Sequence, residues 1–189
     1  GDVAVQGDRI VAVGQVSGTA RETIDADGCI VTPGFVDIHT HYDGQVSWDQ
    51  ILAPSSINGV TSAAIGNCGV GFAPARADKH DWLIQLLEGV EDIPGTALAE
   101  GLTWNWESFP DYLNALSERE YTIDLGAHMP HAALRAYVMG DRGGDHLARP
   151  TQGEVDRMAT RAAEAMEAGA LGFSTSRTHA HRSRDGLNI

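Results

Sequence analysis

The stretch PGFVDIHTH, residues 33–41, decides the fold of this chain. Its Pro-Gly pair interrupts regular structure, and the apolar run that follows has the length and composition of a strand. Successive side chains of a strand point to opposite faces, so His39 and His41 share one face while Val36 and Ile38 take the other. We therefore expect a strand that ends with two imidazoles pointing the same way.

Strand-like runs alternate with helical patterns after this point, which is typical of repeated βα units and a parallel sheet. The predicted strands are 35–41, 61–68, 121–127 and 170–175, and the predicted helices are 48–57, 81–90, 110–116 and one from the capping box at Thr151 to Gly169. A TIM-type barrel needs eight such units in about 250 residues. We expect an α/β fold, a partial TIM-type (β/α) barrel with about the first four units; a half-barrel that must pair with another chain is the alternative.

Residues 1–32 have a different pattern. Val3 and Val5, and then Ile10 and Val11 beyond a Gly-Asp turn, alternate as in a β-hairpin. We expect residues 1–32 to be part of a small N-terminal β-sandwich domain, with Cys29 in its core, and residues 33–189 to be the N-terminal half of the barrel.

Composition excludes several classes of partner. The 26 acidic and 13 basic residues leave a formal charge of -13, which repels nucleic acid and anionic lipid headgroups. Two cysteines are too few for a disulfide framework, and no apolar run approaches the roughly 20 residues of a spanning helix. We expect a soluble cytoplasmic protein with no nucleic-acid or membrane partner.

The pair His39 and His41 is the strongest candidate for chemistry. Imidazoles at the end of an apolar strand can bind one Zn²⁺ or a metal pair at about 2.0 Å, and a merely packed or exposed pair is the alternative. Cys68 ends the next predicted strand, in the glycine-rich run AIGNCGVGF. It could be a buried apolar residue, a thiolate metal ligand or a nucleophile activated by histidine.

Several further histidines and tryptophans have simpler interpretations. His80 and His146 lie in polar, loop-like segments, where a structural role is expected. Trp104 and Trp106 flank an asparagine in an irregular insert, and such a pair is usually a packing anchor. A wall for an acyl group is the alternative for the two tryptophans.

Longer motifs resemble a known family. The stretch DADGCIVTPGFVDIHTHYDGQ is similar to the entry motif of the amidohydrolase superfamily, and GNCG, TWNWESFPDYLNAL, HAALRAYVMG and GALGFSTSR resemble the N-acyl-D-amino-acid deacylase (D-aminoacylase) family. The resemblance implies one or two Zn²⁺ ions bound by His39, His41 and Cys68. His131 matches a histidine of the family's third-strand motif and His128 does not; for both we expect packing or a position behind the metal ligands.

The lysine content favours a cysteine-type centre. Related amidohydrolases such as dihydroorotases and hydantoinases bridge two metals with a carboxylated lysine at the end of strand four. The one lysine here, Lys79, lies in the polar run RADKHD before a helix and cannot be that bridge.

The resemblance also implies residues that the chain does not match. The family draws two more histidine ligands and a catalytic aspartate from later strands, so the acid/base aspartate is expected beyond Ile189. His179 stands where D-aminoacylases have a tyrosine. We expect Arg177 and His179 to bind substrate. Arg177 and the neighbouring His181, Arg182 and Arg184 could bind a substrate carboxylate, with a solvated loop as the alternative.

The activity implied by the resemblance is amide hydrolysis. A metal-activated water would cleave an N-acyl-D-amino acid, a small-molecule substrate, into a carboxylic acid and a free D-amino acid. Two alternatives stay open. One is another amidohydrolase acting on cyclic amides or peptide-like N-acyl compounds, and the other is a non-catalytic metal-binding half-barrel.

Overall fold

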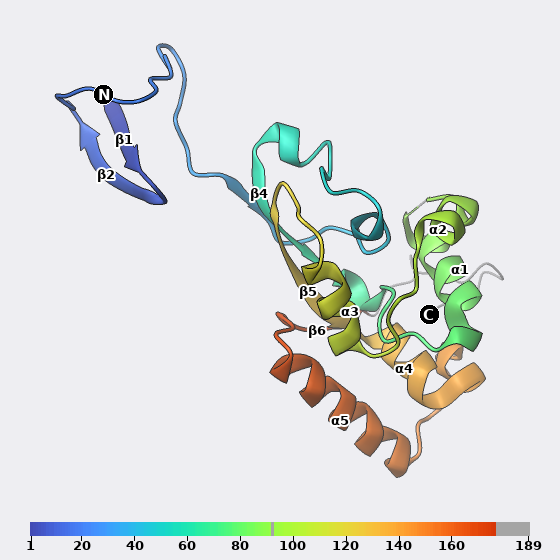
Figure 1. The fold of residues 1–189 in the computed structure, drawn as a ribbon. Helices are drawn as coiled ribbons and strands as arrows, with labels where there is room; N and C mark the ends of the chain where they lie inside the picture. The colour runs from blue at the N-terminus through green and yellow to red at the C-terminus, as the bar shows by residue number, and fades with distance from the viewer. Residues whose placement is uncertain (92, 177–189) are drawn as a thin grey trace. The chain divides into compact units, whose positions relative to one another are not determined.

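The chain folds into two compact units, Gly1–Pro33 and Gly34–Ile189. The computed structural model describes residues 1–91 and 93–176. The smaller unit holds a hairpin, and the larger one holds a parallel sheet with five α-helices among its described residues (Figure 1).

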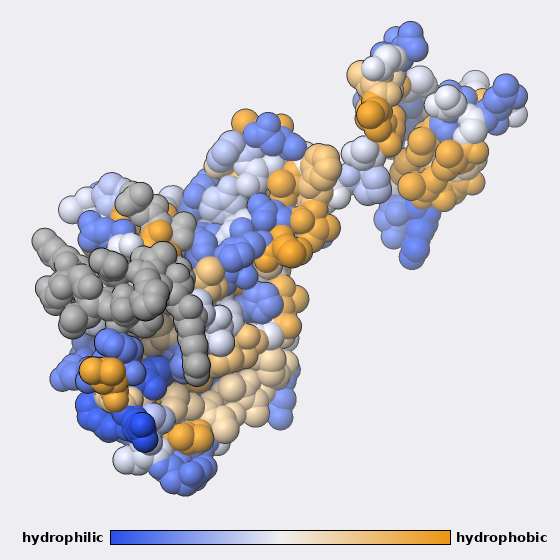
Figure 2. All heavy atoms as spheres, turned by 180° about the vertical axis from the view of Figure 1, so that it is seen from behind, coloured by the Kyte–Doolittle hydropathy of each residue, from blue (hydrophilic) through white to orange (hydrophobic). Residues whose placement is uncertain are grey.

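The smaller unit is built around the predicted hairpin, which is confirmed. Strands β1 (Asp2–Gln6) and β2 (Arg9–Gly14) pair antiparallel, and Gly7 in the turn has φ +63°, a conformation that glycine adopts at little cost. Apolar side chains remain on the surface of this hairpin (Figure 2): Val3, Val5, Ile10, Val11 and Val13. Cys29 is exposed, so its predicted core position is wrong.

The larger unit contains four parallel strands in the order β3-β4-β5-β6. They are β3 (Phe35–Asp37), β4 (Val60–Ile65), β5 (Asp124–Pro130) and β6 (Gly172–Ser174). The strand order equals the chain order, as βα units require, and the sheet is curled. The α/β fold predicted from the sequence, a partial TIM-type barrel, is confirmed.

Helices connect the strands. They are α1 (His80–Glu91), α2 (Gly95–Gly101), α3 (Phe109–Ser117), α4 (His131–Met139) and α5 (Gln152–Glu167), with short 3-10 turns at η1 (Gln45–Ser47), η2 (Ser56–Asn58), η3 (Asn67–Gly69), η4 (Ala77–Lys79) and η5 (Gly140–Gly144). Figure 1 shows α4 and α5 side by side. Within the described residues, no helix has both the length and the apolar character needed to cross a bilayer.

The helix predicted over 48–57 is wrong. Only η2 overlaps this range, since η1 ends just before it, and Leu52 between the two turns has φ +53°, outside the helical range. Pro54 lacks the N–H that a continuing helix needs, and the side chain of Asp49 accepts a hydrogen bond from Ile51 N at 2.8 Å. Local hydrogen bonding therefore replaces the helix. Two short helices that the sequence pattern did not predict, α2 and α4, do form.

The core of the larger unit lies between the sheet and the helices. Ile65 of β4 and Met129 of β5 are fully buried, as are Leu83 and Leu87 of α1 and Leu134 of α4. Leucines four residues apart lie on one face of a helix, so α1 presents a continuous apolar stripe to the core. This packing holds the carboxyl ends of the two central strands in place.

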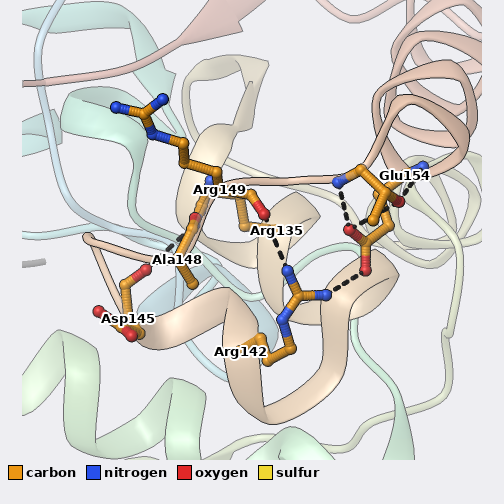
Figure 3. Close-up of polar contacts among 7 residues, drawn as sticks. Arg135, Arg142, Asp145, Ala148, Arg149 and Glu154 are labelled. Carbon is orange, nitrogen blue, oxygen red and sulfur yellow. Dashed lines mark hydrogen bonds and ion pairs between the residues drawn. The ribbon is translucent and has the colours of Figure 1, made fainter.

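A polar cluster joins α4 to α5 (Figure 3). Arg142 donates to the Glu154 carboxylate at 2.8 Å and to the carbonyl of Arg149 at 2.8 Å. The other oxygen of Glu154 accepts from Thr151 N at 2.7 Å, which completes the predicted capping box at the start of α5. Arg135 donates to three backbone carbonyls of the intervening loop, two of them those of Asp145 and Ala148. We call this cluster the α4–α5 joint.

Candidate metal centre

The first part of the site follows the end of β3. His39 and His41 lie just beyond the last strand residue, and Thr40 between them is buried. Both the backbone N–H and the hydroxyl of Thr40 donate to the carbonyl of Ala64 in β4, at 3.1 and 2.8 Å. Thr40 therefore anchors the segment after β3 to β4. Because side chains alternate in an extended segment, His39 and His41 on either side of Thr40 point away from the Thr40 side chain.

The second part is the turn after β4, which carries Cys68. Gly66, Cys68 and Gly69 all have positive φ, at +74°, +57° and +78°. A side chain at the first of these glycines would place its Cβ 2.0 Å from the carbonyl oxygen of His128, so only glycine fits there. Asn67 fixes the turn from the other side, because its amide nitrogen donates to the carbonyl of Thr40 at 3.0 Å.

The two parts meet in a cluster of three potential ligands. One ligand atom from each of His39, His41 and Cys68 lies within 4.8 Å of the others, and we call these three residues the ligand cluster. The Nε2 atom of His39 is 3.0 Å from the Sγ atom of Cys68, and the two imidazole rings are 5.4 Å apart. His39 is exposed and the other two are half-buried. Two imidazoles and a thiol are a donor set suited to Zn²⁺.

Two serines, one at the end of β6 and one just beyond it, hold the Cys68 turn. These contacts were not predicted from the sequence. Ser174 Oγ accepts from Gly69 N at 3.0 Å and donates to the carbonyl of Gly66. Ser176 Oγ donates to the carbonyl of Cys68 at 2.8 Å. No local pattern in the sequence marks these contacts, because Ser176 lies beyond the last residue of β6 and the turn follows a strand that β6 does not pair with.

A buried carboxylate is a further feature that the sequence did not reveal. Asp43, two residues past His41, is only 2% exposed. Its backbone carbonyl accepts a hydrogen bond from the Tyr112 hydroxyl at 3.2 Å. Burial, and next the nearby charge of Asp43, raise the pKa of Tyr112 well above its usual value, so this phenol stays neutral and donates.

His128 and His131 lie near the strand edge but outside the ligand cluster that the described residues form. The Nδ1 atom of His131 is 3.1 Å from the hydroxyl of Thr175, and its ring packs on Phe173. Burial, assisted by the charge of Arg135, lowers the pKa of His131, which favours the neutral imidazole. The packing role expected from the sequence for His131 agrees with these contacts.

The remaining candidates lie away from the ligand cluster. Lys79 forms ion pairs with Asp141 and Asp78. Trp106 is buried and donates to the carbonyl of Phe72 at 2.8 Å, as a packing anchor does. Trp104 stacks on His80 with ring centroids 3.7 Å apart, beside a surface cavity of about 480 Å³.

The predicted substrate contacts Arg177 and His179 lie outside the described residues. The acid/base aspartate stays an expectation, because the predicted position is beyond Ile189. The structure therefore describes the three predicted metal ligands and none of the residues predicted to bind substrate.

The fold agrees with the comparison to known protein families. Residues 22–187 match the amidohydrolase family, and the chain belongs to that family. Within it the resemblance to D-aminoacylases is confirmed: the chain is 36% identical over 176 residues to D-aminoacylase from Alcaligenes xylosoxydans xylosoxydans, covering 92% of this chain and 33% of that protein. The chain thus spans about one third of the length of this relative.

Solved structures show the same relationship. A structure of D-aminoacylase, studied for the functional role of its binuclear metal centre, matches with a TM-score of 0.73 and 35% identity, over 97% of this chain and 36% of that one. N-acyl-D-glutamate deacylase from Bordetella bronchiseptica, in complex with zinc and a phosphonate inhibitor, matches with a TM-score of 0.53 and 30% identity. That match covers 76% of this chain and 27% of the other.

Proposed function

We propose that this chain belongs to a zinc-dependent hydrolase that cleaves the amide bond of N-acyl-D-amino acids, and that His39, His41 and Cys68 bind the metal. The observation that carries the proposal is the convergence of three ligand atoms, from the ends of two neighbouring strands, within 4.8 Å of one another. Relatives that are D-aminoacylase and N-acyl-D-glutamate deacylase support the substrate class. A zinc complex of one relative and the nitrogen and sulfur donors of the cluster support zinc.

Bound zinc would supply Lewis-acid polarisation of the scissile carbonyl and a water that ionises near pH 7. The chain's own residues position this chemistry. Thr40 holds the two histidines at the strand end, and the turn around Cys68 directs the thiol toward His39. The proposal also includes a reducing, cytoplasmic location, because two cysteines are too few for a disulfide framework.

The proposal is tested with the purified protein and a matched panel of N-acyl-D-amino acids, N-acyl-L-amino acids and cyclic imides. We expect hydrolysis of the D compounds, loss of activity on treatment with a chelator, and recovery on addition of Zn²⁺. The His39→Ala variant is expected to be inactive, whereas His146→Ala, which alters an exposed histidine outside the ligand cluster, should retain activity. Hydrolysis confined to cyclic imides would contradict the proposed substrate.

A further inference from the structure

The last residue of β6 and the segment just after it contact the turn that follows β4, although β5 lies between these two strands. β6 pairs with β5 and not with β4, so the sheet itself does not bring these two segments together. The contact is made by serine hydroxyls. Ser174 bridges the turn, accepting from Gly69 N and donating to the carbonyl of Gly66, and Ser176 donates to the carbonyl of Cys68 itself.

The turn needs such support, because its backbone conformation is unfavourable. Cys68 is not a glycine, yet it has φ +57°, in the left-handed region, where a residue with a Cβ is strained by about 1 kcal/mol or more. Gly66 before Cys68 and Gly69 after it allow the chain to turn at this point. They do not fix one conformation of the turn, since glycine populates many conformations. Hydrogen bonds from outside the turn are therefore what select one conformation.

That conformation decides where the thiol points. Three carbonyl or amide groups, at residues 66, 68 and 69, are bound by the two serines, so the backbone on both sides of the Cys68 Cα is held. On the opposite side Asn67 donates to the carbonyls of Thr40 and Ala64. In the resulting geometry the Sγ atom lies 3.0 Å from Nε2 of His39. A rotation of the turn would carry the thiol away from both histidines.

We propose that Ser174 and Ser176 are positioning residues for the Cys68 thiolate, and that they tie the metal site to the fourth strand of the barrel. The inference rests on the proposed function, because it assumes that Cys68 binds the metal. It goes further in assigning a role to two residues outside the ligand cluster. Residues that orient metal ligands typically change metal affinity by 10- to 100-fold when they are replaced.

The test compares Ser174→Ala and Ser176→Ala with the unaltered protein after replacement of the metal by Co²⁺. Thiolate ligation gives a charge-transfer absorption in the near ultraviolet, which reports on the Cys68 sulfur directly. We expect both variants to bind Co²⁺ about 10- to 100-fold more weakly and to show a weaker charge-transfer band per bound ion. The variants Ser174→Thr and Ser176→Thr, which keep the hydroxyl, should restore both readouts.

Ser117→Ala is the matched control. The Ser117 hydroxyl donates to the carbonyl of Asn114 at 2.8 Å at the end of α3, so the variant removes the same kind of hydrogen bond far along the chain from the ligand cluster. We expect its Co²⁺ affinity and spectrum to be unchanged. If Ser174→Ala does not fold, Ser176→Ala decides the question alone, because Ser176 lies beyond the last residue of β6.

The outcomes separate the two proposals. If the unaltered protein binds Co²⁺ without any thiolate band, the proposed role of Cys68 fails. If the unaltered protein shows the band and both serine variants keep its intensity and the affinity, the positioning role is overturned while the metal site stands. A loss of affinity as large in Ser117→Ala as in the serine variants would also overturn the positioning role.

Discussion

The α4–α5 joint and the ligand cluster are both polar groups at the ends of regular elements, but they are built on opposite principles. In the joint, guanidinium donors face a carboxylate and backbone carbonyls, so Arg142 and Glu154 satisfy each other. In the ligand cluster, two imidazoles and a thiol direct ligand atoms toward one another. The opposite charges of the joint attract each other and need no further partner. The ligand atoms of the cluster all carry lone pairs, so a bound cation stabilises them best.

The difference teaches how to separate structural from functional polar residues in this fold. The joint completes the start of a helix, where the first N–H groups need acceptors. The ligand cluster lies at the carboxyl ends of parallel strands, where barrels of this type carry their chemistry. Changes in the joint should therefore alter stability and leave metal binding alone, and changes around the ligand cluster should alter metal binding.

The largest effect is expected from Gly66→Ala. The new Cβ would lie 2.0 Å from the carbonyl oxygen of His128, and the alanine would have to adopt φ +74°. We expect a loss of about 3 kcal/mol or more in the free energy of unfolding, measured by urea denaturation, together with loss of metal binding. The matched control is Gly153→Ala on α5, where the nearest atom is 3.8 Å away and alanine should stabilise the helix slightly. Equal denaturation midpoints for the two variants would contradict this account.

The sequence predicted the ligand cluster better than its surroundings. Alternation along a strand was enough to pair His39 with His41, and the resemblance brought in Cys68. The serine contacts to the Cys68 turn could not be predicted, because β6 pairs with β5 and not with β4, so the contacts join segments that follow two non-adjacent strands.

The same limit applies to the fold. The capping box of Thr151 and Glu154 is a local signal and predicted the start of α5 correctly. The helix expected over 48–57 failed because the proline at position 54 and the side-chain hydrogen bond of Asp49 outweighed the apolar pattern. Strand limits also shifted: β5 runs to Pro130, three residues past the predicted end, since pairing with β6 continues there.

A smaller effect is expected from Thr151→Ala in the joint. The variant removes the side-chain cap that accepts from Glu154 N, at a cost of about 1 kcal/mol in the free energy of unfolding. Metal affinity should equal that of the unaltered protein. Thr160→Ala, within the same helix, is the control and should not destabilise, because its hydroxyl only donates back to the carbonyl of Asp156. A Thr151→Ala protein that bound metal more weakly would remove the distinction between the two clusters.

The smallest effect is expected from pH. Hydrogen bonds and a nearby charge lower the pKa of Glu154 below its usual 4.5. The largest cause is the hydrogen bond from the backbone N–H of Thr151, and smaller ones are the hydrogen bond from the Thr151 hydroxyl and the charge of Arg142. A carboxylate with a lowered pKa in the folded state adds stability above the unfolded pKa, and this stability is lost as the pH falls through the folded pKa. Melting temperatures measured from pH 6 to 3 should therefore fall less steeply for Glu154→Gln than for the unaltered protein. Glu167→Gln, at the other end of α5, controls for the lost charge, and an equal slope in all three proteins would refute the assignment.

The most direct test of the central claim is zinc analysis of the purified protein beside its Cys68→Ala and His39→Ala variants. Cys29→Ala is the matched control, because Cys29 is an exposed thiol in the smaller unit. We expect the unaltered protein and Cys29→Ala to retain zinc equally, and the two ligand variants to bind it more than about 100-fold more weakly. Full retention of zinc by both Cys68→Ala and His39→Ala would contradict the site.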